Sequence, residues 1–226
     1  EITLPTGIDN EGNQRTAVCC LSSLNLDTYD QWKDDPQFVE DVMRFLDNVM
    51  TDFISNAPES FDNAKYSAMR ERSVGLGVMG LHSFFQQKNI PFGSVMSKVW
   101  NQKIFKHIYD KTNEASLKLA EERGACPDAQ EYGINERFSN KTAIAPTASI
   151  SIICGGASPG IEPIAANSYT HKTLSGSYNV RNKYLKKILE KYGKNNDEVW
   201  STITTNQGSV SHLEFLTDLE KDTFKT

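Results

Sequence analysis

The sequence has 226 residues, of which 38% are hydrophobic and 23% are charged, and this composition excludes a disordered, fibrous or disulfide-stapled chain. The 24 lysines and arginines and the 29 acidic residues give a net charge of −5, so we expect no general binding to nucleic acid. No stretch approaches the roughly 20 apolar residues of a membrane-spanning helix, so we expect no membrane contact either.

The four cysteines, Cys19, Cys20, Cys126 and Cys154, form neither a Cys-x-x-Cys pair nor a zinc-type cluster with histidine. We therefore predict no disulfide framework, no bound metal and a reducing, cytoplasmic location. No charged segment followed by an apolar one opens the sequence, so we expect no secretory signal and a chain that is part of something longer.

The first 35 residues combine turn-forming residues with one strand-like run, TAVCCLSSLNL, at 16–26. A cysteine in such a run is usually a small buried apolar residue. A helix is predicted next, because apolar residues recur at helical spacing from Phe38 until Asn56 and Pro58 end the pattern.

The segment from residue 63 to residue 85 changes from polar to glycine-rich, and GLGVMG at 75–80 matches the Gly-x-Gly-x-x-Gly pattern of dinucleotide-binding folds. That fold needs a strand directly before the first glycine, whereas residues 64–72 are helical in character. We therefore interpret these glycines as allowing close backbone packing within a buried element.

A second long helix is predicted from about Ser97 to Arg123, with Gly124 as its C-cap. The residues expected on one face of this helix are Ile104, Ile108, Ala115 and Leu119. Residues 124–140 are predicted to form a loop, and two further helices are predicted at about 182–192 and 211–219. Alternating strand and helix signals indicate a layered or barrel-like α/β architecture.

Residues 145–150, APTASI, follow a short apolar run and offer hydroxyl and backbone N–H groups at a turn. Such a turn can bind phosphate, particularly where it leads into a helix, but an ordinary helix N-cap is the more frequent use of these residues. The Gly-Lys-Ser/Thr of a P-loop is missing, which argues against an ATPase. The residues alone leave phosphate binding and capping open.

Five motifs in order resemble the second half of the catalytic subunit of ribonucleotide reductases, and together they extend over essentially the whole chain. They are EITLPTG at 1–7, AVCCLSSLNL at 17–26, RERSVGLGVMGLHSFF at 70–85, ERGACPD at 122–128, and APTASIS at 145–151 followed by GIEP at 160–163. The resemblance implies that residues 1–226 form a single partial domain, the C-terminal portion of the family's ten-stranded α/β barrel.

The resemblance also implies roles for particular residues. Glu1 aligns with the glutamate that accepts a proton from the ribose 3′-hydroxyl, a role that suits a positioned carboxylate. Cys19, rather than Cys20, aligns with one of the two thiols that reduce the substrate and end as a disulfide. The residues that align with the substrate-phosphate loop are Pro146, Thr147, Ala148, Ser149 and Ile150.

The implied activity is reduction of ribonucleotides, as ribonucleoside-diphosphate reductase, by thiyl-radical chemistry. The radical cysteine and the partner of Cys19 would lie in the N-terminal half of the catalytic subunit. A small radical-generating (beta) subunit, thioredoxin or glutaredoxin as reductant, and ATP or dNTP effectors bound elsewhere are implied as well, with no cofactor on this chain. We therefore expect the chain to be an excerpt or a split-gene product that is inactive alone.

Two other interpretations remain at this point. A cobalamin-dependent or glycyl-radical reductase shares the same barrel and would differ in what lies outside these residues. A non-catalytic, nucleotide-binding remnant would lack any companion sequence with the radical cysteine.

Overall fold

The computed structural model describes residues 3–174 and 176–226, and the chain divides into two compact units. The first unit comprises the chain up to Leu24, Thr28–Val78 and Gln102–Thr147. The second unit comprises Asn25–Asp27, Met79–Asn101 and Ala148–Thr226.

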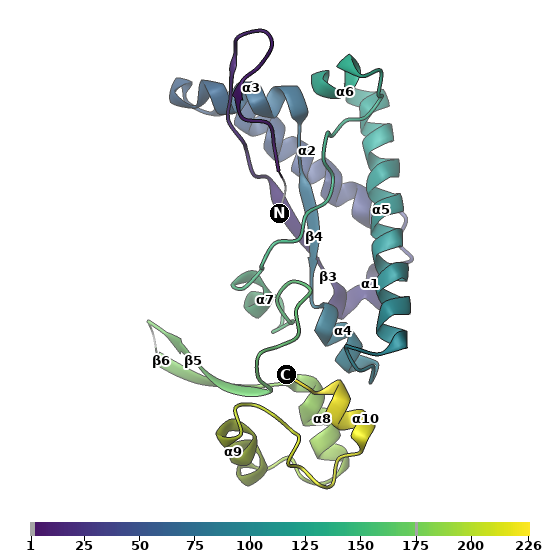
Figure 1. Cartoon of the computed structure of the whole chain (residues 1–226), viewed down its shortest axis with the longest axis vertical. Coiled ribbons are helices and arrows are strands. Elements are labelled where there is room, and N and C mark those ends of the chain that lie inside the picture. Colours follow the sequence, from purple (N-terminus) through teal and green to yellow (C-terminus); the bar gives the residue numbers. More distant parts are fainter. Residues whose placement is uncertain (1–2, 175) are drawn as a thin grey trace. The chain divides into compact units, whose positions relative to one another are not determined.

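The elements that lie wholly or mostly in the first unit can be followed in Figure 1. They are β1 (Gly7–Ile8), β2 (Gln14–Arg15), β3 (Leu21–Asn25), α1 (Tyr29–Trp32), α2 (Phe38–Asn56), η2 (Glu59–Phe61), α3 (Asp62–Glu71), β4 (Gly75–Met79), α5 (Val95–Arg123) and α6 (Pro127–Glu131). The elements of the second unit are η1 (Leu26–Thr28), α4 (Leu81–Gln87), α7 (Ile150–Ile153), β5 (Ser168–Thr173), β6 (Gly176–Arg181), α8 (Lys183–Lys191), α9 (Asp197–Thr205) and α10 (Asp218–Thr223).

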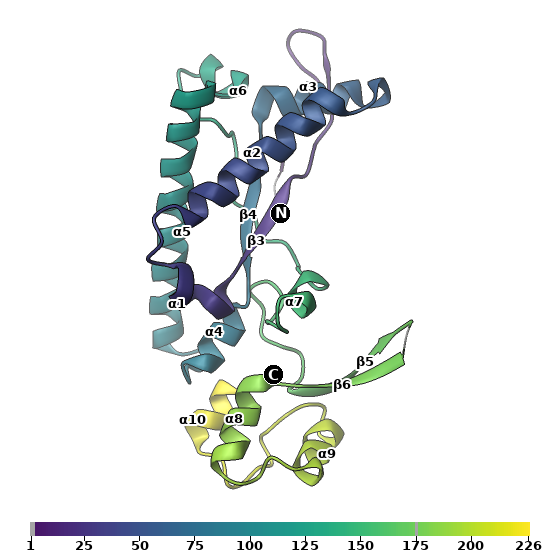
Figure 2. The ribbon, with the colours of Figure 1, turned by 180° about the vertical axis from the view of Figure 1, so that it is seen from behind.

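The centre of the first unit is the hydrogen-bonded pair β3 and β4. Helix α2 lies on one face of this pair, behind the strands in Figure 1 and in front of them in Figure 2. The apolar residues that α2 buries are Val39, Met43, Leu46 and Met50. Their spacing follows the 3.6-residue period of a helix, so the apolar stripe in the sequence becomes the face that packs on the unit.

Strand β4 explains the glycine pattern at 75–80. All five residues of β4 are buried, and α3, not a strand, precedes it. A Cβ on Gly77 would lie 2.1 Å from the carbonyl oxygen of Ala143, a distance that no side chain could accept. Leu76 also pairs with Thr142 in a parallel bridge. The interpretation of the motif as allowing close backbone packing in a buried element is therefore confirmed at Gly77.

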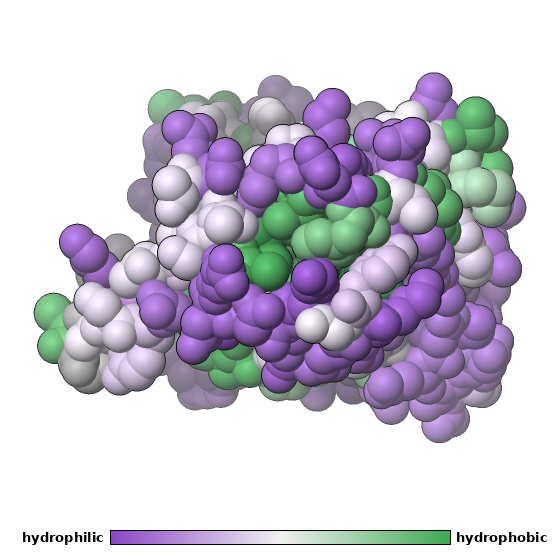
Figure 3. All heavy atoms as spheres, turned by 90° about the horizontal axis from the view of Figure 1, so that it is seen from below, coloured by the Kyte–Doolittle hydropathy of each residue, from purple (hydrophilic) through white to green (hydrophobic). Residues whose placement is uncertain are grey.

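The second unit is built around an apolar cluster from its C-terminal helices and the segments between them. The buried members are Tyr184, Leu185, Leu189, Trp200, Ile203, Val210, Leu213, Leu216 and Phe224. Figure 3 shows that the hydrophobic surface in the middle of the face seen from below is framed by hydrophilic residues. The hairpin of β5 and β6 pairs in antiparallel register from Ser168 with Arg181 to Thr173 with Gly176.

Most of the predicted elements are confirmed. The first long helix runs over Phe38–Asn56, the second over Val95–Arg123, and the basic helix over Lys183–Lys191. Gly124 has φ +87°, as a left-handed C-cap requires, and the predicted inner face of α5 is buried.

Other expectations need correction. The predicted loop at 124–140 contains α6, and the hairpin of β5 and β6 and helix α9 were not predicted. The predicted helix at 211–219 is wrong, since α10 covers Asp218–Thr223. The reason is local. The Thr217 hydroxyl accepts from the backbone N–H of Glu220, and the Glu220 carboxylate accepts from that of Thr217, so this capping box fixes where the helix begins.

Candidate active site

Of the predicted site residues, Glu1 lies outside the described residues, and Cys19 lies just before the start of β3, which pairs with β4. Cys19 and Cys20 come just before β3, so they are outside the regular strand in which the sequence places them. The carbonyl of Cys20 nevertheless accepts a hydrogen bond of 2.9 Å from the N–H of Gly75, which fixes the backbone here.

The two neighbouring thiols differ in their surroundings. Cys19 is exposed, whereas Cys20 is half-buried with its Sγ 3.9 Å from the carbonyl oxygen of Leu46. Burial, with a smaller contribution from Cys19, raises the pKa of the Cys20 thiol. Because the thiolate is the reactive form and access is required, Cys19 is the better placed of the two for thiol chemistry.

Residues 146–150 form an irregular loop that leads into α7. Pro146, Ala148, Ser149 and Ile150 are exposed, whereas Thr147 is 8% exposed. Thr147 has φ +51°, a left-handed backbone that β-branched residues rarely adopt. Strained backbone of this kind is found preferentially at functional sites.

Ser149 occupies the N-cap position of α7, but its side chain makes no capping hydrogen bond. The N-cap interpretation of these residues is therefore correct in position only. The hydroxyl is left at the surface next to the first turn of a short helix, where the backbone N–H groups lack partners within that helix.

The pairing pattern places Cys19 and the start of the loop on neighbouring segments of the first unit. The N–H of Gly75, at the start of β4, donates to the carbonyl of Cys20. Thr142 pairs with Leu76 in a parallel bridge, so the chain around Thr142 runs in the same direction as β4. Pro146 follows four residues after Thr142, so the loop begins toward the end of β4 while Cys19 lies at its start.

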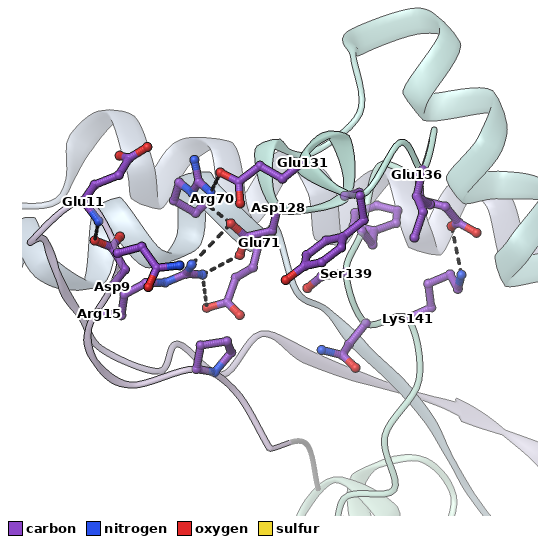
Figure 4. Close-up of a pocket in the computed structure, with 17 residues that line it drawn as sticks. Asp9, Glu11, Arg15, Arg70, Glu71, Asp128, Glu131, Glu136, Ser139 and Lys141 are labelled. Atoms are coloured by element: carbon purple, nitrogen blue, oxygen red, sulfur yellow. Dashed lines mark hydrogen bonds and ion pairs between the residues drawn. The ribbon is translucent and has the colours of Figure 1, made fainter.

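A sizeable cavity lies elsewhere in the first unit. It has a volume of about 650 Å³, and its described lining includes neither Cys19 nor any of residues 146–150. Figure 4 shows Arg15 directed toward Glu71 and Asp128, and Arg70 directed toward Asp128 and Glu131. The Arg15 guanidinium donates to both carboxylate oxygens of Asp128, at 2.6 and 3.2 Å.

Glu71 is the unusual group at this cavity. Its side chain is 2% exposed, neither carboxylate oxygen has a hydrogen-bond partner, and its ion pair with Arg15 is 3.8 Å long. Burial raises the pKa of the Glu71 carboxyl to about 7, with Arg15 opposing the shift and Asp128 adding to it. Sequence reasoning missed this cluster, because its members are far apart along the chain and carry no motif.

Two other features are missing from the described residues, a cluster of metal ligands and a membrane-spanning helix. Within residues 3–174 and 176–226, no three His, Cys, Asp or Glu side chains gather as metal ligands would. No helix in the same residues combines the length and the apolar character that crossing a bilayer requires.

Comparison with known proteins identifies the family. The sequence model of the ribonucleotide reductase barrel domain matches residues 1–136 and 128–226, which together make up the whole chain. The chain therefore belongs to the ribonucleotide reductase barrel family. The expected fold, a part of the family's α/β barrel, is confirmed by this match and by a solved structure of the same family.

Individual relatives give the same result. Along its full length the chain is 48% identical to the ribonucleoside-diphosphate reductase large subunit of Invertebrate iridescent virus 6 and 45% identical to that of Invertebrate iridescent virus 3. It covers 23% and 35% of those proteins. The structure of the Actinobacillus ureae class Id ribonucleotide reductase alpha subunit matches 94% of the chain with a TM-score of 0.85 and 42% identity, and the chain covers 39% of it.

Proposed function

We propose that this chain supplies part of the active site of a ribonucleoside-diphosphate reductase large subunit. The observation that carries the proposal is the match of the whole chain to the barrel domain, together with relatives named as ribonucleoside-diphosphate reductase large subunits. The chain spans well under half of those relatives, so the remaining part of the catalytic subunit is the first partner that the proposal requires.

Cys19 is the proposed reducing thiol on this chain. Reduction of the ribose 2′ carbon needs two electrons, and the 2′-hydroxyl leaves as water. Two thiols supply the electrons and are themselves oxidised to a disulfide. The exposure of Cys19 supports this role, whereas Cys20 is half-buried and the pKa of its thiol is raised. A second cysteine from the rest of the subunit completes the pair.

Glu1 is the proposed proton acceptor for the 3′-hydroxyl of the ribose. A radical at the 3′ carbon forms more easily as this hydroxyl loses its proton, so a positioned carboxylate lowers the barrier. The starting thiyl radical is proposed to come from a cysteine outside this chain, generated by a small radical-generating subunit. Thioredoxin or glutaredoxin would reduce the disulfide afterwards, and nucleotide effectors would bind elsewhere on the subunit.

Residues Pro146–Ile150 are the proposed substrate-phosphate loop. Backbone N–H groups at a turn that leads into a helix hold phosphate oxygens without needing a lysine or arginine. The left-handed backbone at Thr147 and the exposed, uncapped Ser149 support this assignment. The hydroxyl of Ser149 would be one further donor.

The experiment that tests the loop is the substitution Ser149→Asp in the assembled enzyme. A negative charge beside the phosphates should weaken binding of the ribonucleoside diphosphate more than tenfold, which corresponds to about 1.4 kcal/mol or more. Ser201→Asp, which adds the same charge at an exposed position of α9, is the matched control and should leave affinity unchanged. An unchanged dissociation constant for Ser149→Asp would contradict the assignment.

A further inference from the structure

The N-terminus of α4 lacks a cap of its own. Its N-cap residue, Gly80, has φ +81° and no side chain to accept from the first N–H groups of the helix. A Cβ at Gly80 would lie 3.0 Å from both the Asn25 Oδ1 and the Asp27 nitrogen, so the chain packs too closely here for a serine or aspartate cap. The N–H groups of this first turn therefore need acceptors from elsewhere.

Ser158 supplies the missing cap from a distant part of the chain. Its hydroxyl accepts from the N–H of Ser83 at 3.1 Å, and the Ser83 hydroxyl accepts from the N–H of Ser158 at 2.8 Å. The carbonyl of Ser158 also accepts from the N–H of Gly80 at 2.7 Å. Ser83 and Ser158 are 4% and 1% exposed, so these bonds are shielded from water. The pair therefore fixes Ser158 on α4 from two directions.

Hydrogen bonds continue from Ser158 back to the proposed phosphate loop. The preceding residue, Ala157, donates its N–H to the carbonyl of Ser151 at 3.0 Å. The hydroxyl of Ser151 lies 3.4 Å from the carbonyl oxygen of Ala148, to which it donates. Ser151 is 2% exposed, so its position is set by this packing.

His82, the neighbour of Ser83 on α4, holds the far end of the same segment. Its Nδ1 accepts from the N–H of Ile164 at 2.9 Å, which requires that this nitrogen carry no proton. The ring is fully buried, and burial lowers the pKa of His82 to about 4, against a smaller opposing effect of a hydrogen bond with the Thr223 backbone. The ring is thus neutral at physiological pH, and it can accept.

We propose that His82 and Ser83 are positioning residues for the substrate-phosphate loop, acting through Ser158 and Ile164. The inference rests on the proposed function and deepens it, since it identifies what keeps the loop in its binding geometry. Neither side chain is proposed to touch substrate. Phosphate held by backbone N–H groups depends on where those groups point, so loss of the anchor should weaken binding without altering the chemistry.

The test compares two serine deletions in the assembled enzyme. Ser83→Ala removes the acceptor for Ser158, whereas Ser97→Ala removes an equally buried hydroxyl of the same unit that bonds to the Phe92 and Ser94 carbonyls instead. Ser83→Ala should raise the KM for the ribonucleoside diphosphate about fivefold, which corresponds to about 1 kcal/mol, with kcat within about twofold. Ser97→Ala should leave both constants unchanged.

A second pair of variants separates positioning from stability. His82→Asn keeps an acceptor where Nδ1 lies, and His82→Leu removes it and leaves the Ile164 N–H without a partner. His82→Leu should raise the KM and speed amide hydrogen exchange in residues 148–164, and His82→Asn should restore both.

The outcomes also distinguish this inference from the function on which it rests. Faster exchange in residues 148–164 with an unchanged KM, in an enzyme where Ser149→Asp weakens substrate binding, would overturn the positioning role alone. Equal effects of Ser83→Ala and Ser97→Ala on the KM would overturn it too. An unchanged affinity in Ser149→Asp would remove the loop assignment itself.

Discussion

The first unit buries the carboxylate of Asp47 among three arginines, whereas the second unit anchors the first turn of α4 through neutral groups. Asp47 is 0% exposed and contacts Arg72, Arg123 and Arg137 at 2.7 to 2.9 Å. Around α4 the partners of Ser158 and Ile164 are hydroxyls, backbone groups and a neutral imidazole. Both regions are buried, but only the first depends on a charge.

This difference matters for a segment proposed to bind phosphate. A carboxylate or guanidinium among the anchoring groups would add a fixed charge whose effect on an anionic ligand is strong in a buried site. The bonds to Ser158 and Ile164 add no such charge, and the Lys183 ammonium, which donates to the carbonyl of Gly155 in the same segment, is paired with the carboxylate of Asp27. The anchor should also work at any pH at which His82 stays neutral, that is, above its pKa of about 4.

Glu71 is a third kind of buried group, a carboxyl without a close partner. Like Asp47 it is a buried carboxyl, but it has an ion pair of 3.8 Å and no hydrogen bond. Burial opposes ionisation of both groups, yet hydrogen bonds from Arg137 and Arg123 and the charge of Arg72 hold the pKa of Asp47 below its ordinary value, while the pKa of Glu71 rises to about 7. Burial of a carboxyl is thus tolerated in two ways, by full pairing or by taking up a proton.

The largest predicted effect is that of Asp47→Asn. The substitution keeps the shape but leaves three arginines without their shared anion, so the free energy of unfolding should fall by about 3 to 5 kcal/mol. The folded-state pKa of Asp47 is lowered, so its stabilisation is complete above a pH of about 4 and is lost as the pH falls further. Urea denaturation measures the change, and Asp41→Asn, exposed on the same helix, is the control.

A stability gain is expected from Glu71→Gln at pH 8. The folded-state pKa of about 7 lies above the unfolded value of about 4.5, so the native state is stabilised by the bound proton below pH 4.5 and loses this stabilisation as the pH rises through 7. The glutamine variant should be more stable than the parent by about 2 to 3 kcal/mol at pH 8 and equal to it near pH 4.5. Glu121→Gln, an exposed change on α5, should show no such trend, and a pH-independent effect of Glu71→Gln would show that folding does not raise the pKa of Glu71.

The smallest predicted effect concerns the pair of serines that anchors α4. In a double-mutant cycle, Ser83→Ala and Ser158→Ala should show a coupling energy of about 1 kcal/mol, the size expected for hydrogen bonds between neutral groups. Neither hydroxyl titrates, so the coupling should be the same at pH 5 and pH 8. A coupling that changes over this range would mean that a charged group takes part in the anchor.

Local sequence patterns predicted the long elements well and the short ones poorly. The apolar period from Phe38 and the glycine after Arg123 were sufficient for α2 and α5. Helix α9 begins at an Asn196 cap and is only nine residues long, so its apolar residues, Val199, Trp200 and Ile203, make too short a period to mark it. The start of α10 could have been predicted from the Thr217 and Glu220 capping box, but apolar residues upstream gave a competing signal.

The proposed site residues come from the resemblance alone. Nothing in the residues alone distinguishes Cys19 from Cys20 as a reducing thiol, and the residues at 146–150 alone favour a helix cap over a phosphate loop. The Glu71 cavity was not predictable, because Arg15, Glu71 and Asp128 meet only in the folded chain. The hydrogen bonds between Ser83 and Ser158 join residues 75 positions apart in the sequence, so they were not predictable for the same reason.

The most direct test of the proposed function is the oxidation state of the two vicinal cysteines after turnover. The assembled enzyme would be given ribonucleoside diphosphate without an external reductant, stopped after one turnover, and analysed by mass spectrometry with and without reduction. The account predicts that Cys19, the exposed thiol, is linked to a cysteine from the rest of the subunit while Cys20 remains a thiol. A disulfide at Cys20, or product formed with Cys19 still reduced, would contradict it.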